Sequence, residues 1–186
     1  MPNPDSFALA ALAEGEGLAA VLVGGNAVNL YAYFRTTFDV DLLVPESQTE
    51  RWLSFFQERG YEIFHRTPNF MRLRFAPDPG GALPVDLMLS DDETFRKIQG
   101  ESRRCEVGNG ISLAIPSVLH LIAMKLHALR SPQRVQHGVD LQDVKHLIKT
   151  AKIDISSQEF IEVAERYGTE AIRARIEREL GEESGA

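Results

Sequence analysis

The chain has 186 residues, of which 44% are apolar, enough to bury the core of one domain with at most a modest appendage. Its 27 acidic and 20 basic side chains leave a net charge of −7, which excludes general attraction to a polyanion as its main means of binding. The single cysteine, Cys105, excludes an intramolecular disulfide, and no leader peptide or membrane-spanning stretch is visible. We therefore expect a soluble, cytoplasmic protein.

Short strands and helices are predicted to alternate in the first part of the chain. The apolar run LAAVLV at 18–23 is typical of a buried strand, and Asn26 is expected to cap the helix that follows it. Arg72 and Arg74 alternate with apolar residues, as in a half-buried strand. We expect helices at 7–13, 26–34 and 48–59, and strands at 18–23, 38–44, 61–65, 70–75 and 85–89.

The last third of the chain shows only helical periodicity. Helices are expected at 117–130, 139–151, 156–166 and 169–180, and loops at 76–82, 100–110, 131–138 and 181–186. The sequence therefore predicts an α/β (α+β) protein, with a mixed sheet and flanking helices in residues 1–115 and a helical bundle in residues 116–186.

Two acids at spacing i and i+2 are the first candidates for chemistry. Asp39 and Asp41 lie on a predicted strand, so their carboxylates leave the same face. At a separation of ~6 Å and an effective dielectric of 20 they repel by about 3 kcal/mol. They therefore face water, lose one charge by protonation, or bind a divalent cation, for which hard oxygen ligands favour Mg²⁺.

Asp86 is a third candidate, because it interrupts the apolar run PVDLML at 84–89. A lone carboxylate is costly to bury in a strand interior. If this strand lies beside 38–44, three carboxylates converge at one edge of the sheet, as metal-dependent phosphoryl chemistry requires. The alternative is that Asp86 lies at a strand end and faces solvent.

Gly24 and Gly25 follow a buried strand and precede a helix, where backbone N–H groups can approach phosphate oxygens. They are equally compatible with a simple turn. The sequence contains neither a dinucleotide-binding fingerprint nor a P-loop, and its histidines lack zinc-ligand spacing.

Three charged residues lie on the apolar sides of two predicted C-terminal helices. Lys125 shares a stripe with Ile122 and Leu129, which suits either an anion-binding lysine or one whose stem merely covers apolar surface. Asp140 lies on the apolar side of the next helix, with Asp143 at its margin. Pairing of either acid with Lys125 would serve catalysis or simply lock the bundle.

The residues of two segments resemble a known family. GGNAVNLYAYFRTTFDVD at 24–41 is similar to the first motif of the nucleotidyltransferase superfamily, in particular its AbiEii/AbiGii-like toxin branch. IPSVLHLIAMKLHALR at 115–130, followed by DLQDVKHLI at 140–148, resembles a later segment of that branch. The chain departs from these patterns at Gly25, where many members have serine, and at Val139, where this branch often has lysine.

The resemblance implies a nucleotidyltransferase fold and roles for particular residues. Asp39 and Asp41 would bind Mg²⁺ that bridges the nucleotide phosphates, and Asp86 would complete the metal site or deprotonate the acceptor. Lys125 would contact phosphate, and Asp140 or Asp143 would be the family's later acid. The implied nucleotide-binding residues are Gly24, Gly25, Arg35, Thr36, Thr37, Lys125, Asp140 and Asp143.

The implied activity is Mg²⁺-dependent transfer of a nucleoside monophosphate from an NTP to RNA or protein. As in the toxin branch, the chain would be a toxin with a cognate antitoxin. Two alternatives remain open: a small hydroxylated acceptor such as an aminoglycoside or lincosamide, and a silent nucleotide- or partner-binding module that retains the fold. Seven arginines are candidates for an RNA-binding track: Arg66, Arg72, Arg74, Arg103, Arg104, Arg130 and Arg134.

Overall fold

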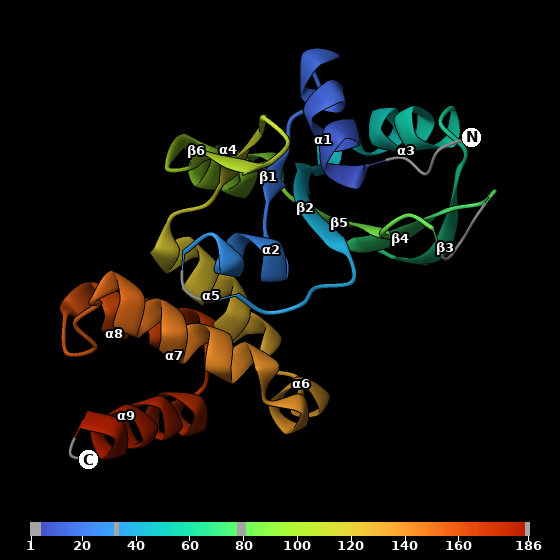
Figure 1. The fold of residues 1–186 in the computed structure, drawn as a ribbon. Coiled ribbons are helices and arrows are strands. Elements are labelled where there is room, and N and C mark those ends of the chain that lie inside the picture. Colours follow the sequence, from blue (N-terminus) through green and yellow to red (C-terminus); the bar gives the residue numbers. More distant parts are fainter. Residues whose placement is uncertain (1–4, 32–33, 78–80, 185–186) are drawn as a thin grey trace. The chain divides into compact units, whose positions relative to one another are not determined.

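The computed structural model describes residues 5–31, 34–77 and 81–184, and the chain divides into two compact units (Figure 1). The first unit comprises the described residues of 1–30 and 35–117, and the second those of 31–34 and 118–186. Among the helices of the described ranges, none combines the length and the apolar character needed to cross a membrane.

A five-stranded mixed sheet forms the centre of the first unit. The second and third strands in sheet order run parallel to each other, and each of the remaining neighbouring pairs is antiparallel. This arrangement confirms the predicted mixed α/β fold. The strands, in sheet order, are β1 (Val21–Leu22), β2 (Val40–Pro45), β5 (Val85–Ser90), β4 (Phe70–Phe75) and β3 (Tyr61–Thr67).

Burial explains why β2 and β5 lie side by side. Val40, Leu42, Val85 and Leu87 are buried in these two strands, as expected for parallel strands inside a sheet. Their register pairs Val40 with Val85 and Leu42 with Leu87. The residues between these apolar pairs are therefore also neighbours, and this alignment determines the composition of the site described below.

Helices of the first unit contribute much of its core. In α3 (Thr49–Gln57), which follows the 3₁₀ turn η1 (Glu46–Gln48), the ring of Trp52 stacks on Phe56 with centroids 5.8 Å apart. Phe56 in turn meets Tyr61 of β3 edge-on at 5.1 Å. Such aromatic contacts add to the free energy of area burial. The unit's other helices are α1 (Ser6–Gly15), α2 (Gly24–Asn29) and α4 (Asp92–Gly100).

The predicted loop at 100–110 is wrong, because a β-hairpin occupies most of it. Strands β6 (Arg103–Gly108) and β7 (Ile111–Ile115) pair antiparallel in a separate two-stranded sheet. Asn109 and Gly110 have positive φ angles of 53° and 73°, as the tight turns of hairpins require. The Asn-Gly dipeptide was the available signal for this hairpin. Helix α4 was also absent from the prediction.

The second unit is helical. Helix α5 packs against α7 and α8, and α9 contacts both α7 and α8. The four predicted helices are present, and the expected loop at 131–138 contains a fifth, α6, with proline at its first position. The helices are α5 (Val118–Ala128), α6 (Pro132–His137), α7 (Val139–Ala151), α8 (Gln158–Tyr167) and α9 (Glu170–Ser184).

Candidate active site

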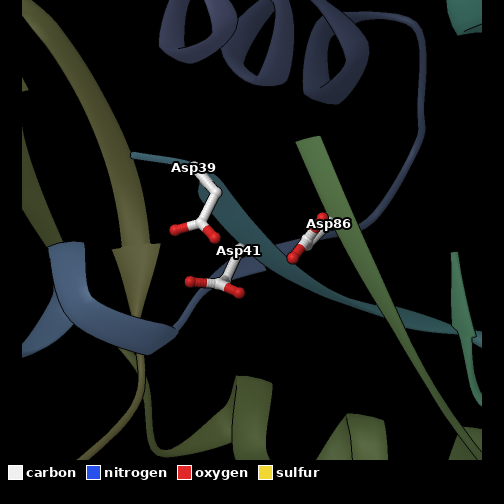
Figure 2. Close-up of side chains that lie close together, drawn as sticks. All are labelled: Asp39, Asp41 and Asp86. Atoms are coloured by element: carbon white, nitrogen blue, oxygen red, sulfur yellow. The ribbon is translucent and has the colours of Figure 1, made fainter. Parts of the chain in front are cut away.

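Three carboxylates meet at one end of the two parallel strands. Asp39 lies directly before β2, Asp41 lies within it, and Asp86 lies in β5 (Figure 2). Each offers an oxygen within 4.8 Å of the others. The parallel register pairs Asp41 directly with Asp86, while the alternation of a strand directs Asp39 and Asp41 to one face. The structure thus brings together the three acids that sequence reasoning selected.

The carboxylates differ in burial. The side chain of Asp86 is 4% exposed, whereas that of Asp39 is 32% exposed, so the cluster is closed on the β5 side and accessible at Asp39. The alternative placement of Asp86, at a strand end facing solvent, is wrong because the residue is buried and interacts with neighbouring side chains.

Arg72 of β4 supplies positive charge to this cluster. Its Nε donates to Asp86 Oδ1 at 2.7 Å, and its Nη2 donates to Asp86 Oδ2 at 2.6 Å and to Asp39 Oδ2 at 2.9 Å. The antiparallel register of β4 and β5 places Arg72 opposite Asp86. Hydrogen bonding to Asp86, with the charges of the acids, raises the pKa of the Arg72 guanidinium above its ordinary value.

Sequence reasoning missed this role of Arg72. Its alternation with apolar residues correctly predicted a half-buried strand position, but the side chain was grouped with the arginines of an RNA-binding track. The available signal was weak: an arginine and an aspartate on two strands that pair only in the tertiary structure.

Two glycines at the start of α2 let its backbone lie close to Asp41 and to residues shortly before β2. At Gly24, whose φ is +63°, an added Cβ would lie 1.9 Å from Asp41 Oδ2. At Gly25, a Cβ would lie 2.4 Å from Thr37 Cγ2 and 2.7 Å from Arg35 Nη2. A side chain at Gly24 would require Asp41 to move at a strained φ, and one at Gly25 would require Thr37 and Arg35 to shift. This packing places the glycine pair beside Asp41, Thr37 and Arg35.

Sequence reasoning predicts that Asn26 caps a helix, and this prediction is wrong. Helix α2 already begins at Gly24, and Asn26 instead donates from Nδ2 to the backbone oxygen of Asp39 at 2.8 Å. Its Oδ1 accepts from the Thr37 hydroxyl at 2.8 Å. Asn26 thus ties α2 to the backbone of Asp39, the first acid of the cluster.

One helical turn later, Asn29 holds the other end of the same loop. Its Nδ2 donates to the backbone oxygen of Arg35 at 2.8 Å, and its Oδ1 accepts from the Arg35 N–H at 3.1 Å. Thr36, between Arg35 and Thr37, is exposed. Asn26 and Asn29 were not recognised as site residues, although their i, i+3 spacing places both on one side of a helix.

The donor set of the cluster fits a hard divalent cation. All three candidate ligands offer carboxylate oxygens, which suit Mg²⁺ or Mn²⁺ better than softer metals that prefer nitrogen or sulfur. The partly exposed side at Asp39 leaves room for the water and phosphate ligands that Mg²⁺ usually retains. The carboxylates therefore match the metal site that the sequence predicted.

Lys125 lies in the second unit, within a buried group of charges. Its Nζ lies 2.8 Å from Asp140 Oδ1 and 2.8 Å from Asp143 Oδ2, and Arg134 Nη1 lies 3.0 Å from Asp140 Oδ2. The side chains of Lys125, Asp140 and Asp143 are 9%, 5% and 0% exposed. Of the roles left open by the sequence, these contacts favour the ion pair that locks the bundle. Phosphate contact by Lys125 stays a prediction.

Several candidates for the RNA-binding track are engaged within the protein. Arg66 pairs with Glu50, Arg104 with Glu14, and Arg134 with Asp140. The guanidinium of Arg74 lies over the ring of Phe64, 3.3 Å from its centroid. These contacts reduce the positive potential that the arginines would offer to a phosphate backbone.

A mixed sheet that joins a Gly-Gly turn to three clustered carboxylates defines the nucleotidyltransferase class of fold. A family model described as "nucleotidyl transferase of unknown function (DUF2204)" matches residues 7–180, and the chain belongs to this family. Membership confirms the predicted nucleotidyltransferase assignment at the level of the superfamily. The narrower resemblance to the toxin branch has no such support.

Solved structures share the fold at low sequence identity. The antibiotic-resistance factor ANT(2″)-Ia, in a crystal structure of its complex with adenylyl-2″-tobramycin, is 16% identical, with a TM-score of 0.57 over 92% of this chain and 94% of that one. A nucleotidyltransferase-like protein from Paracoccidioides brasiliensis is 18% identical, with a TM-score of 0.56 over 86% and 84%. The lincosamide adenylyltransferase LnuA, bound to lincomycin, is 17% identical, with a TM-score of 0.52 over 76% and 92%. No curated protein sequence matches the chain.

Proposed function

We propose that this protein transfers a nucleoside monophosphate from an NTP to an acceptor hydroxyl in a Mg²⁺-dependent reaction that releases pyrophosphate. The observation that carries the proposal is the cluster of Asp39, Asp41 and Asp86, with oxygens within 4.8 Å of one another, in a chain of the nucleotidyl transferase family. When bound, Mg²⁺ supplies positive charge to the phosphates and to the leaving pyrophosphate.

The remaining roles in the reaction fall to residues of the chain. The acceptor oxygen forms a bond to the α-phosphorus, the bond from that phosphorus to the β-phosphate oxygen breaks, and the acceptor proton passes to a base. Both oxygens of Asp86 accept hydrogen bonds from Arg72, which favours the charged carboxylate and thus metal ligation over proton uptake. Asp39 is 32% exposed, so water reaches the cluster at this carboxylate and can take up that proton while all three acids hold the metal.

The turn at Gly24 and Gly25 is proposed to receive the triphosphate. Its backbone lies against Asp41 on one side and against the Arg35 guanidinium on the other, so metal ligands and positive charge flank it. Thr36 and Thr37 lie in the same loop, and Thr37 is held by Asn26. Since Gly25 replaces the serine of many superfamily members, backbone groups and Arg35 would make the contacts that a serine hydroxyl makes elsewhere.

The acceptor we propose first is RNA or protein, with the chain as the toxin of a toxin–antitoxin pair; this rests on the motif resemblance alone. A small, cationic, hydroxylated acceptor is the second candidate. It is supported by the net charge of −7 and by a fold shared with ANT(2″)-Ia and LnuA, whose structures hold an adenylylated tobramycin and lincomycin. The engagement of several arginines with acids is a further argument for it.

Label transfer tests the activity and the acceptor together. The protein is incubated with each α-labelled NTP and Mg²⁺, with total RNA, cell lysate, an aminoglycoside or a lincosamide as acceptor. We expect labelled product and pyrophosphate from wild type and a loss of at least about a thousandfold in Asp41→Asn. Asp92→Asn is the matched control, because Asp92 is exposed at the start of α4 and should behave as wild type.

The possible results of this assay distinguish the proposed activity from its alternatives. Equal labelling by wild type and Asp41→Asn would refute the proposed site. Mg²⁺-dependent NTP binding without any pyrophosphate release would identify a silent binding module. Co-expression with the product of an adjacent gene, followed by rescue of growth, tests the toxin role separately from the chemistry.

A further inference from the structure

Arg72 lies where a metal ion's charge would be needed. Its guanidinium donates to two of the three candidate metal ligands, Asp86 and Asp39, at 2.6–2.9 Å. The three carboxylates and this guanidinium sum to a charge of −2 when all are ionised. A cation that is already hydrogen-bonded to the ligands necessarily affects how a second cation binds.

We propose that Arg72 acts as a resident counter-ion of the acid cluster, and that a divalent cation binds in competition with its contact to Asp39 while its contact to Asp86 persists. The inference rests on the proposed function, since it assumes that the three acids are the metal site. Arg72 is on this view a positioning residue: it keeps Asp86 in place and lowers the affinity of the free protein for metal.

The two contacts of Arg72 differ in a way that identifies which one opens. With Asp86 it forms two parallel hydrogen bonds to a carboxylate that is 4% exposed, the strong and specific geometry for this pair. With Asp39 it shares a single Nη2 donor, at 2.9 Å, and both side chains are 32% exposed. The Asp39 contact is therefore the weaker one and is screened by solvent.

Competition follows from charge and from the small volume that the candidate ligand oxygens share. Asp39 Oδ2 accepts from Arg72, and metal ligation requires a carboxylate oxygen in the same small volume. A dication near the guanidinium also meets direct repulsion. The triphosphate of an incoming nucleotide would offset this repulsion with its own negative charge. Metal is thus expected to load together with the nucleotide rather than before it.

The inference is tested by titrating the nucleotide-free protein with Mn²⁺ and measuring the concentration of free ion by electron paramagnetic resonance. In Arg72→Gln the charge is lost, and we expect Mn²⁺ affinity to increase by about tenfold or more. Arg72→Lys retains the charge and should stay near wild type. Arg74→Gln is the matched control, since Arg74 lies two residues further along β4 and stacks on Phe64.

A measurement on the wild-type protein tests the inference even if the Arg72 variants do not fold. In nitrogen-resolved NMR spectra of the arginine side chains, saturating Mg²⁺ should speed the exchange with water of the Arg72 Nη2 proton that is bonded to Asp39, while the Nη2 and Nε protons bonded to Asp86 stay protected. Unchanged exchange of the Nη2 proton bonded to Asp39 would overturn the inference, as would loss of protection at Nε.

The titration also separates this inference from the proposed function. If wild type binds Mn²⁺ and Arg72→Gln binds it equally or more weakly, the counter-ion role is wrong while the metal site stands. If neither wild type nor Arg72→Gln binds Mn²⁺, with or without NTP, both the inference and the proposed metal-dependent function fail.

Discussion

The two units of this protein each contain a cluster of aspartates around a cation, and the clusters differ in exposure. In the first unit Asp39 and Arg72 are both 32% exposed, whereas in the second Lys125 and Asp143 are at most 9% exposed. In the second cluster the charges of Asp140 and Asp143 are balanced by Lys125 together with Arg134 at its margin. The first cluster keeps an excess of negative charge beside solvent.

This difference shows what distinguishes a candidate ligand site from a structural ion pair. Buried charges must be compensated within the protein, because desolvation is otherwise too costly. A partly exposed cluster can retain an imbalance that a metal ion relieves. The same residue types, aspartates with basic partners, therefore serve different purposes according to their access to water. Four predictions test or refine this contrast.

The largest effect on stability is expected for Lys125→Met. The change leaves Asp140 and Asp143 buried without their shared partner, so the free energy of unfolding should fall by about 3–5 kcal/mol. Urea denaturation measures this loss, and Arg72→Gln is the comparison, with a smaller loss because Arg72 itself and one of its partners, Asp39, are each 32% exposed. A variant with unchanged stability but no NTP affinity would instead make Lys125 a phosphate ligand, as the resemblance implies.

Gly24→Ala should disturb both stability and the metal site. The new Cβ would lie 1.9 Å from Asp41 Oδ2 at a φ of +63°, so Asp41 must move and the backbone is strained. We expect a loss of about 1–3 kcal/mol in unfolding free energy, together with weaker Mn²⁺ binding. Gly100→Ala, where no atom lies within 4 Å of the added carbon, is the control and should retain both.

Asn26→Ala removes two hydrogen bonds that tie α2 to the site, one to the Asp39 backbone and one from the Thr37 hydroxyl. A loss of about 1–2 kcal/mol is expected from thermal or urea unfolding, along with lower transfer activity. Asn29→Ala, which instead releases the backbone of Arg35, should affect nucleotide affinity more than Mn²⁺ affinity. Identical behaviour of the two variants would argue against separate roles.

The smallest expected effect is the pH dependence of stability that comes from the partly exposed ion pairs of Glu179. Hydrogen bonds from Arg175 and Lys145 hold the pKa of Glu179 below its ordinary value of 4.5. A carboxyl with a lowered pKa in the folded state contributes stability above pH 4.5, and this contribution is lost as the pH falls through the folded pKa. The urea midpoint should thus decline in acid, and less steeply in Glu179→Gln. Equal slopes would show that Glu179 contributes little.

Local patterns predicted much of the fold because they report local physics. Helix α7, at Val139–Ala151, and strand β4, at Phe70–Phe75, have the bounds that periodicity indicated. The hairpin at 103–115 was missed because its strands are short and three of the six residues of β6 are charged, and its one strong signal, Asn109-Gly110, was read as an ordinary loop.

The sequence by itself determined which acids would share a face and which turn would be free of side chains, since strand alternation and glycine geometry depend only on neighbouring residues. Only the tertiary structure decided that β2 pairs in parallel with β5, and that β4 then brings Arg72 opposite Asp86. Strand partners and their register depend on the burial of apolar residues far apart in the chain. The charge balance of the site follows from that pairing, because it sets which carboxylates the guanidinium can reach.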